Sequence, residues 1–222
     1  MTQDVTVVLA HGAWADGSSW SRVIDRLRMQ GQRAIAAPLP LTTLADDVAA
    51  LDRAIERAGG PVILVGHAYA GAVIGATRHE KVKALVYVAA LAPDEGETVA
   101  DVFTRTAPHP LAPDGSGLMW LPDDAFANAF APQADAGEQA VLAAVQRPIS
   151  IDCIVVPVGR PRWRDLPSWY LIAEEDRMIS GENQRFMAER MGATIASHAL
   201  DHSPMIGAPD DVTAIILSAV RA

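Results

Sequence analysis

One stretch, Val62 to Gly71, limits the fold of this chain more than any other. It begins with an apolar run typical of a buried strand and passes through Gly66 into small residues that open a helix-like segment. A strand that leads so directly into a helix requires a sharp turn between them. The sequence therefore predicts a buried strand, a sharp turn and a helix start, with Ala68 at the turn.

Apolar runs alternate with amphipathic segments along much of the chain. Further strands are predicted near residues 5–10, 33–37, 82–91, 167–173 and 194–199. Helical segments lie between several of them; one has Thr43 as a plausible cap, with Asp46 and Asp47 in its first turn. Strands that alternate with helices form βαβ units. We therefore expect an α/β fold, with a mostly parallel sheet of about six strands and helices on both faces.

The pattern changes between about Asp94 and Leu166, where prolines are frequent and the helical patches, such as Asp123 to Phe130 and Ala136 to Gln146, are short. We interpret residues 94–166 as a cap insertion over the carboxyl edge of the sheet, within a single domain that spans residues 1–222. The apolar residues of the cap are expected to wall a pocket for apolar ligands. They include Phe103, Leu118, Met119, Trp120, Phe126 and Phe130.

The overall charge restricts the class of partner. A formal net charge of −9 and a pI near 5.0 disfavour nucleic acid and anionic membrane surfaces, because both are bound through clustered Lys and Arg. No apolar stretch approaches membrane-spanning length, and residues 1–4 carry no basic region. Cys153 is the only cysteine, which suits a reducing compartment and the role of a small buried hydrophobe. We expect a cytoplasmic protein.

Five short stretches occur in a fixed order along the chain. They are His11–Trp14 after the first predicted strand, Gly66–Gly71 at the sharp turn, Pro167–Tyr170, Asp176, and His202 in the last loop. In this order the chain resembles the small esterase and hydroxynitrile-lyase-like branch of the α/β-hydrolase superfamily, over nearly its whole length. The resemblance implies an α/β-hydrolase fold and an esterase-like activity on small apolar esters or lactones.

The resemblance also implies a role for each residue of the catalytic machinery. His202 would be the general base, and Asp176 would accept its Nδ1 proton and hold the imidazole in one tautomer. The backbone N–H groups of Ala13 and Tyr69 would form an oxyanion hole. The expected catalytic set is therefore Asp176 and His202, together with whatever stands at the nucleophile position.

Other polar and aromatic residues near the expected site have less defined roles. Gly12 and Trp14 are expected to contribute to substrate binding, and the Tyr69 hydroxyl either donates to a substrate or packs against the cap. Three hydroxyls lie near the site in sequence but not at the sharp turn, and we expect none to be the nucleophile: Ser18, Ser19 and Ser203. The histidine spacings suggest no metal site, and no organic cofactor is implied.

Ala68 stands where the family carries its serine nucleophile. A methyl group cannot attack a carbonyl, so the acyl-enzyme route is closed in this chain. Two explanations stay open: an engineered Ser→Ala change in an esterase or lactonase, or a natural sequence in which His202 activates water or abstracts a proton. A third is a ligand-binding pseudoenzyme, although retention of Asp176 and His202 argues against it. The expected partner is a small-molecule substrate; a homodimer is compatible with the sequence but has no signal in it.

Overall fold

The computed structural model describes residues 5–104 and 113–222. The amino-terminal residues 1–4 and residues 105–112 of the predicted cap lie outside the described residues. Within these ranges no helix is long and apolar enough to cross a membrane.

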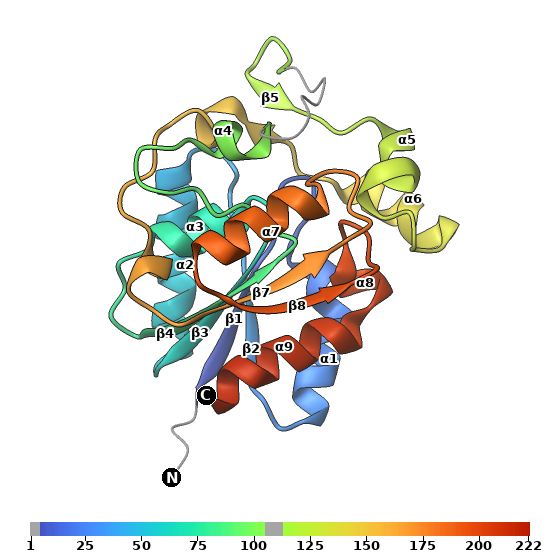
Figure 1. Cartoon of the computed structure of the whole chain (residues 1–222). Helices are drawn as coiled ribbons and strands as arrows, with labels where there is room; N and C mark the ends of the chain where they lie inside the picture. Colours follow the sequence, from blue (N-terminus) through green and yellow to red (C-terminus); the bar gives the residue numbers. More distant parts are fainter. Residues whose placement is uncertain (1–4, 105–112) are drawn as a thin grey trace.

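Six strands form one sheet in the order β2-β1-β3-β4-β7-β8, and each neighbouring pair is parallel (Figure 1). The strands are β1 (Thr6–Ala10), β2 (Ala34–Ala37), β3 (Val62–His67), β4 (Val82–Val88), β7 (Ser168–Ala173) and β8 (Thr194–His198). Every residue of β1, β3 and β7 is buried, as expected for strands that helices cover on both faces. The predicted α/β fold with a parallel sheet is confirmed.

The strand order reverses direction at β1. The chain runs from β1 out to β2, and then returns to the other side of β1 for β3, β4, β7 and β8. Open parallel sheets bind ligands in the crevice at the carboxyl ends of the strands beside such a reversal. The loops that follow β1 and β3 therefore occupy the place in the sheet where a site is expected.

Helices pack on both faces of the sheet. Outside the β4–β7 connection they are α1 (Ser21–Met29), α2 (Leu44–Ala58), α3 (Ala70–Ala76), α7 (Gly181–Arg190), α8 (Pro204–Gly207) and α9 (Pro209–Arg221), with a 3₁₀ turn, η1 (Gly17–Trp20), before α1. Helix α1 packs against α9, and α2 packs against α3 (Figure 1). The predicted N-cap residue of α2, Thr43, is confirmed, because its side chain accepts the Asp46 N–H at 3.0 Å.

The β4–β7 connection contains the segment that we predicted as a cap. Its elements are α4 (Val99–Phe103), β5 (Leu118–Met119), α5 (Asp123–Ala125), η2 (Phe126–Phe130), α6 (Ala136–Val145), β6 (Ile149–Ser150), η3 (Ile151–Cys153) and η4 (Arg162–Arg164). Figure 1 shows α4, β5, α5 and α6 at the end of the molecule away from both termini. The helix predicted at 136–146 is confirmed as α6.

Two details of this connection differ from the sequence-based expectation. The helix expected at 123–130 is a short α5 followed by η2, a π-helical turn in which the Ala131 N–H bonds to the Phe126 carbonyl at 2.9 Å. Strands β5 and β6 form a small antiparallel pair that we did not predict. Each of these strands has only two residues, which is too short to produce an alternating pattern in the sequence.

Candidate active site

The turn after β3 has the sharp geometry predicted from its small residues. Ala68 lies between β3 and α3 with φ of 48°, in the left-handed region that residues other than glycine rarely adopt. A Cβ atom added at Gly66 would lie 2.7 Å from the Ala70 carbonyl oxygen, and one added at Gly71 would lie closer than 3.0 Å to the Leu91 carbonyl oxygen. Close packing on both sides therefore fixes the turn.

The loop after β1 packs directly against this turn. A Cβ atom added at Gly12 would lie 3.0 Å from the Ala68 Cβ and 3.0 Å from the His67 Nδ1. Glycine thus lets the two loops approach each other. The next residue, Ala13, and Ala68 both line the same cavity.

A buried acid and base lie beside the turn. The Nδ1–H of His202 donates to Oδ2 of Asp176 at 2.8 Å, and the exposed fractions of the two side chains are 2% and 0%. The Asp176 carboxylate also accepts the backbone N–H groups of Met178 and Ile179 on Oδ1, and the side-chain amide of Gln184 on Oδ2. A carboxylate that accepts four donors fixes the proton of His202 on Nδ1 and leaves Nε2 as a base.

Adjacent strands bring these two side chains together. Asp176 follows β7, and His202 lies in the loop between β8 and α8. Strands β7 and β8 are paired in parallel, so their carboxyl ends present both loops at the same edge of the sheet. Asp176 and His202, which are 26 positions apart in the chain, are therefore close enough to form a hydrogen bond.

Two other buried histidines hold the backbone around the site. The His67 Nε2–H donates to the His202 carbonyl at 2.7 Å, and burial holds the pKa of His67 well below its ordinary value. The Leu39 N–H donates to the His11 Nε2 at 3.1 Å, so the His11 Nδ1 carries the proton and donates to the Gly12 carbonyl at 3.0 Å. Burial also lowers the pKa of His11. Both rings are neutral supports for the backbone of the site.

Two backbone N–H groups next to the cavity are available to a ligand. Within the described residues, neither the Ala13 N–H nor the Tyr69 N–H donates to a protein acceptor. The neighbouring Trp14 has φ of 58°, and its own N–H is bonded to the Arg147 carbonyl at 3.0 Å. Ala13 and Tyr69 are the two residues for which the sequence predicted oxyanion-binding N–H groups.

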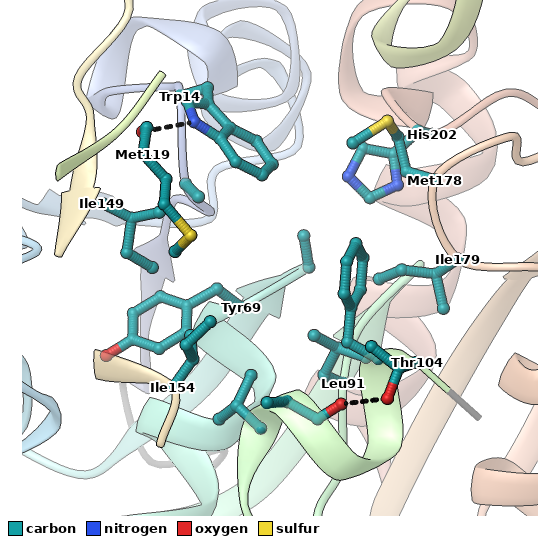
Figure 2. A pocket seen from close by; sticks show the side chains of 15 residues that line it. Trp14, Tyr69, Leu91, Thr104, Met119, Ile149, Ile154, Met178, Ile179 and His202 are labelled. Atoms are coloured by element: carbon teal, nitrogen blue, oxygen red, sulfur yellow. Dashed lines mark hydrogen bonds between the residues drawn. The ribbon is translucent and has the colours of Figure 1, made fainter. Parts of the chain in front are cut away.

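The cavity has a volume of about 140 Å³. Trp14, Met119 and Ile149 line one side and face His202, Met178 and Ile179 across the space (Figure 2). No Lys, Arg, Asp or Glu is among the described residues that line it. An apolar cavity of roughly 150 Å³ in a protein core can hold benzene, so this one suits a ligand group of about one aromatic ring.

The Tyr69 hydroxyl points away from the cavity (Figure 2). It donates to Oδ2 of Asp47 at 2.7 Å, and Asp47 is fully buried. The Cys153 thiol lies 3.7 Å from the same oxygen, and burial raises its pKa to about 12. The hypothesis that the Tyr69 hydroxyl donates to a substrate is therefore wrong, because Asp47 already accepts its proton. Only the ring of Tyr69 faces the ligand space.

Most of the residues predicted for the site lie in or beside the cavity. Ala13, Trp14, Ala68, Tyr69 and His202 line it. The Trp14 ring is held in place because its Nε1–H donates to the Met119 carbonyl at 3.0 Å. Two predicted residues lie outside the lining: Asp176 behind His202, and Gly12 against Ala68.

The predicted cap residues divide into three groups. Phe103 and Met119 line the cavity, as expected. Phe126, Phe130 and Leu118 do not line it; both phenylalanines are buried, and the Phe130 ring packs against the His202 ring. The prediction for Trp120 is wrong, because this side chain is 49% exposed. Hydrophobicity alone could not distinguish these cases, since orientation depends on backbone geometry that the sequence pattern does not contain.

Several residues of the site have no marker in the sequence. Ile149, Ile154, Met178 and Ile179 line the cavity but belong to short connections without periodicity. Among the described residues, no group of three or more His, Cys, Asp or Glu is arranged to hold a metal ion.

A family model described as the alpha/beta hydrolase family matches residues 7–215. The chain belongs to the α/β-hydrolase family. The match covers β1 from Val7, the other five strands of the main sheet, and both loops that carry Asp176 and His202.

Individual α/β-hydrolases resemble this chain over nearly its full length. The alpha/beta hydrolase nvfD of Aspergillus novofumigatus is 25% identical over 96% of this chain and 95% of its own length. A mutant of polyneuridine aldehyde esterase has a TM-score of 0.83 at 18% identity, over 96% of this chain and 98% of that chain. A variant of tomato methylketone synthase I complexed with beta-ketoheptanoate has a TM-score of 0.82 at 18% identity, over 98% of both chains. The two structures share the fold.

Proposed function

We propose that this chain is an esterase-like enzyme of the α/β-hydrolase family that acts on small apolar carbonyl compounds without a serine nucleophile. The observation that supports this most is the buried Asp176–His202 pair, which opens on an apolar cavity beside the methyl group of Ala68. A pure binding protein gains nothing from a buried acid and base, because burial of ionisable groups is costly. A pair that transfers protons during a reaction accounts for the buried acid and base.

In the hydrolytic route, His202 acts on water. Its Nε2 takes a proton from a water molecule, the resulting hydroxide attacks the carbonyl carbon, and the leaving alkoxide takes the proton back. The N–H groups of Ala13 and Tyr69 hold the negative charge that develops on the carbonyl oxygen. Asp176 stabilises the imidazolium during the reaction. Every step proceeds without a covalent bond to residue 68.

A specific comparison favours a second reaction, the decarboxylation of a β-keto acid. One structural neighbour is a methylketone synthase complexed with beta-ketoheptanoate. When such an acid loses CO₂, the electron pair of the broken C–C bond moves to an enolate, and no nucleophile is needed. The same two N–H groups would hold the enolate oxygen, and His202 would relay a proton from water to the carbon. The described residues that line the cavity include no Lys or Arg, and such a lining disfavours a carboxylate and favours its loss as neutral CO₂.

We also propose a cytoplasmic location and a small-molecule substrate as the partner. An acidic chain with a single cysteine, Cys153, suits a reducing cytoplasm and a small-molecule substrate better than nucleic acid or a membrane. No metal or organic cofactor takes part in either route. A homodimer is compatible with the proposal but is not required by it.

The experiment compares the unmodified chain with the His202→Ala variant. We expect slow turnover of a short-chain aryl ester or a medium-chain β-keto acid, followed as phenol or CO₂ release, and loss of that turnover in His202→Ala. The substrate that turns over distinguishes the two reactions. Tight binding of both compounds with equal, background rates for the two proteins would contradict the proposal and indicate a ligand-binding pseudoenzyme.

A further inference from the structure

The residues on both sides of Asp176 and His202 bond to one segment of the insertion. We call this segment, residues 128–133, the 128–133 brace. The four bonds run from Gln133 Nε2 to Glu175 Oε2 (3.1 Å), from Arg177 Nη1 to the Asn128 carbonyl (2.9 Å), from Gln133 N to Asp201 Oδ2 (2.8 Å) and from Ser203 Oγ to the Phe130 carbonyl (2.7 Å). Each catalytic loop is therefore held twice, by residues immediately before and after its catalytic side chain.

The bonds to the His202 loop are the more deeply buried. Ser203 is fully buried and Asp201 is 2% exposed. Oδ1 of Asp201 also accepts the Ser203 N–H at 2.9 Å, so the two flanking residues are joined to each other as well as to the brace. The Phe130 ring meets the His202 ring edge-on at 5.3 Å between centroids. The imidazole is thus enclosed by the brace as well as by its own loop.

The π-helical turn η2 is what brings the brace to the loop. Its wide bond, from the Ala131 N–H to the Phe126 carbonyl, ends the helix beside His202, and the Phe130 carbonyl accepts the Ser203 hydroxyl there. Single π-turns are frequent at functional sites because they redirect the chain locally. The sequence predicted a helical patch at 123–130 but not this π-helical turn.

We propose that the 128–133 brace sets the geometry of the Asp176–His202 pair, with Ser203, Asp201 and Gln133 as positioning residues. The insertion then has two roles: its Met119 and Phe103 wall the cavity, and its brace holds the base in register with the acid. The catalytic meaning of this inference rests on the proposed function, but the geometric claim does not. A misplacement of a catalytic group by about 1 Å can cost on the order of 100-fold in rate.

The direct test is the NMR signal of the His202 Nδ1–H. A proton shared with a buried carboxylate exchanges slowly with water and gives a separate downfield resonance, which His202→Gln identifies by its loss. We expect Ser203→Ala, which loses the bond to the Phe130 carbonyl, to speed exchange of this proton by roughly tenfold. We expect Gln133→Ala, which loses the side-chain bonds to Glu175 and Ala199, to speed it by about threefold. Unchanged exchange in both folded variants would overturn the inference.

Matched controls separate positioning from a general loss of stability. Ser218→Ala removes a serine bond to the Ile215 carbonyl in α9, and Gln146→Ala removes two glutamine bonds inside the insertion but outside the brace, both to the backbone of Leu121. Neither control touches the acid or base loop, so exchange of the His202 proton should stay unchanged in both. Equal acceleration in controls and brace variants would contradict a positioning role. Gln133 is exposed, so its variant gives an answer even if Ser203→Ala does not fold.

A second readout uses activity. In whichever reaction the enzyme supports, Ser203→Ala should lower kcat by on the order of tenfold and change KM by less than about twofold, because the cavity walls are untouched. If the unmodified chain shows no turnover, the proposed function is contradicted but the positioning inference is not, because the NMR test needs no substrate. A rise in KM at constant kcat would show that the brace shapes the cavity instead of the acid–base pair.

Discussion

The hydroxyl of Tyr69 donates a hydrogen bond of 2.7 Å to the carboxylate of Asp47, a side chain with no solvent exposure. Asp47 also accepts the Leu41 N–H at 2.7 Å, so its charge is satisfied by donors from three parts of the chain when the Cys153 thiol is included. This arrangement turns the ring of Tyr69 toward the cavity and its hydroxyl away from it. The hydrogen bond to Asp47 therefore fixes the orientation of Tyr69, the residue that follows Ala68.

Tyr69→Phe should destabilise the protein. The substitution keeps the ring that faces the cavity but removes one of the donors to a buried carboxylate, which costs about 1–3 kcal/mol. Urea unfolding followed by circular dichroism measures the change. Tyr87→Phe is the matched control, because the Tyr87 hydroxyl is buried without a hydrogen-bond partner among the described residues. We expect the control to be neutral or slightly stabilising; equal losses in both variants would contradict this account.

Asp47→Asn should change how stability depends on pH. Burial raises the pKa of Asp47 above its ordinary value of 3.8, so the folded state binds more protons than the unfolded state in the range above that value. Its contribution to stability is therefore present at low pH and lost as pH rises. As pH rises above 3.8, the stability of Asp47→Asn should therefore increase relative to that of the unmodified chain, measured by urea unfolding at each pH.

The neighbouring Asp46 provides a control of opposite sign. Hydrogen bonds from the hydroxyls of Thr43 and Thr42 lower the pKa of Asp46, so its contribution is present at neutral pH and lost as pH falls. Asp46→Asn should therefore lose stability relative to the unmodified chain at neutral pH and regain it in acid. Parallel pH profiles for the two variants would show that burial of Asp47 does not have the stated effect.

The two glycines of α3 should respond differently to alanine. A Cβ atom at Gly71 would collide with the Leu91 carbonyl, whereas one at Gly75 meets nothing closer than 3.4 Å. Gly71→Ala should cost about 1–3 kcal/mol through overpacking, and Gly75→Ala should gain about 0.5–1 kcal/mol from helix propensity. Thermal melts of both variants check this. Similar melting temperatures would mean that the turn after β3 is less tightly packed than described.

The sheet could be predicted because local patterns encode it, and much of the site followed from the resemblance to α/β-hydrolases. All six strands were predicted, most of them from apolar runs, and small residues marked the turn at Ala68. The Tyr69–Asp47 bond and the 128–133 brace could not be predicted, because each joins segments that are far apart in the chain and leave no periodicity. The outward orientation of Trp120 was missed for a related reason: a hydrophobic side chain in an irregular segment has no fixed face.

The central proposal is that Asp176, His202 and the two backbone donors form a hydrolytic site that works on water and that would also use a serine placed at residue 68. The most direct measurement is the rate of short-chain aryl ester hydrolysis by the chain and by Ala68→Ser, each with and without His202→Ala. The account predicts that serine raises the rate by on the order of 1,000-fold or more, and that His202→Ala abolishes the gain. A folded Ala68→Ser protein with no gain would contradict the claim and show that the acid, base and backbone donors are arranged for other chemistry.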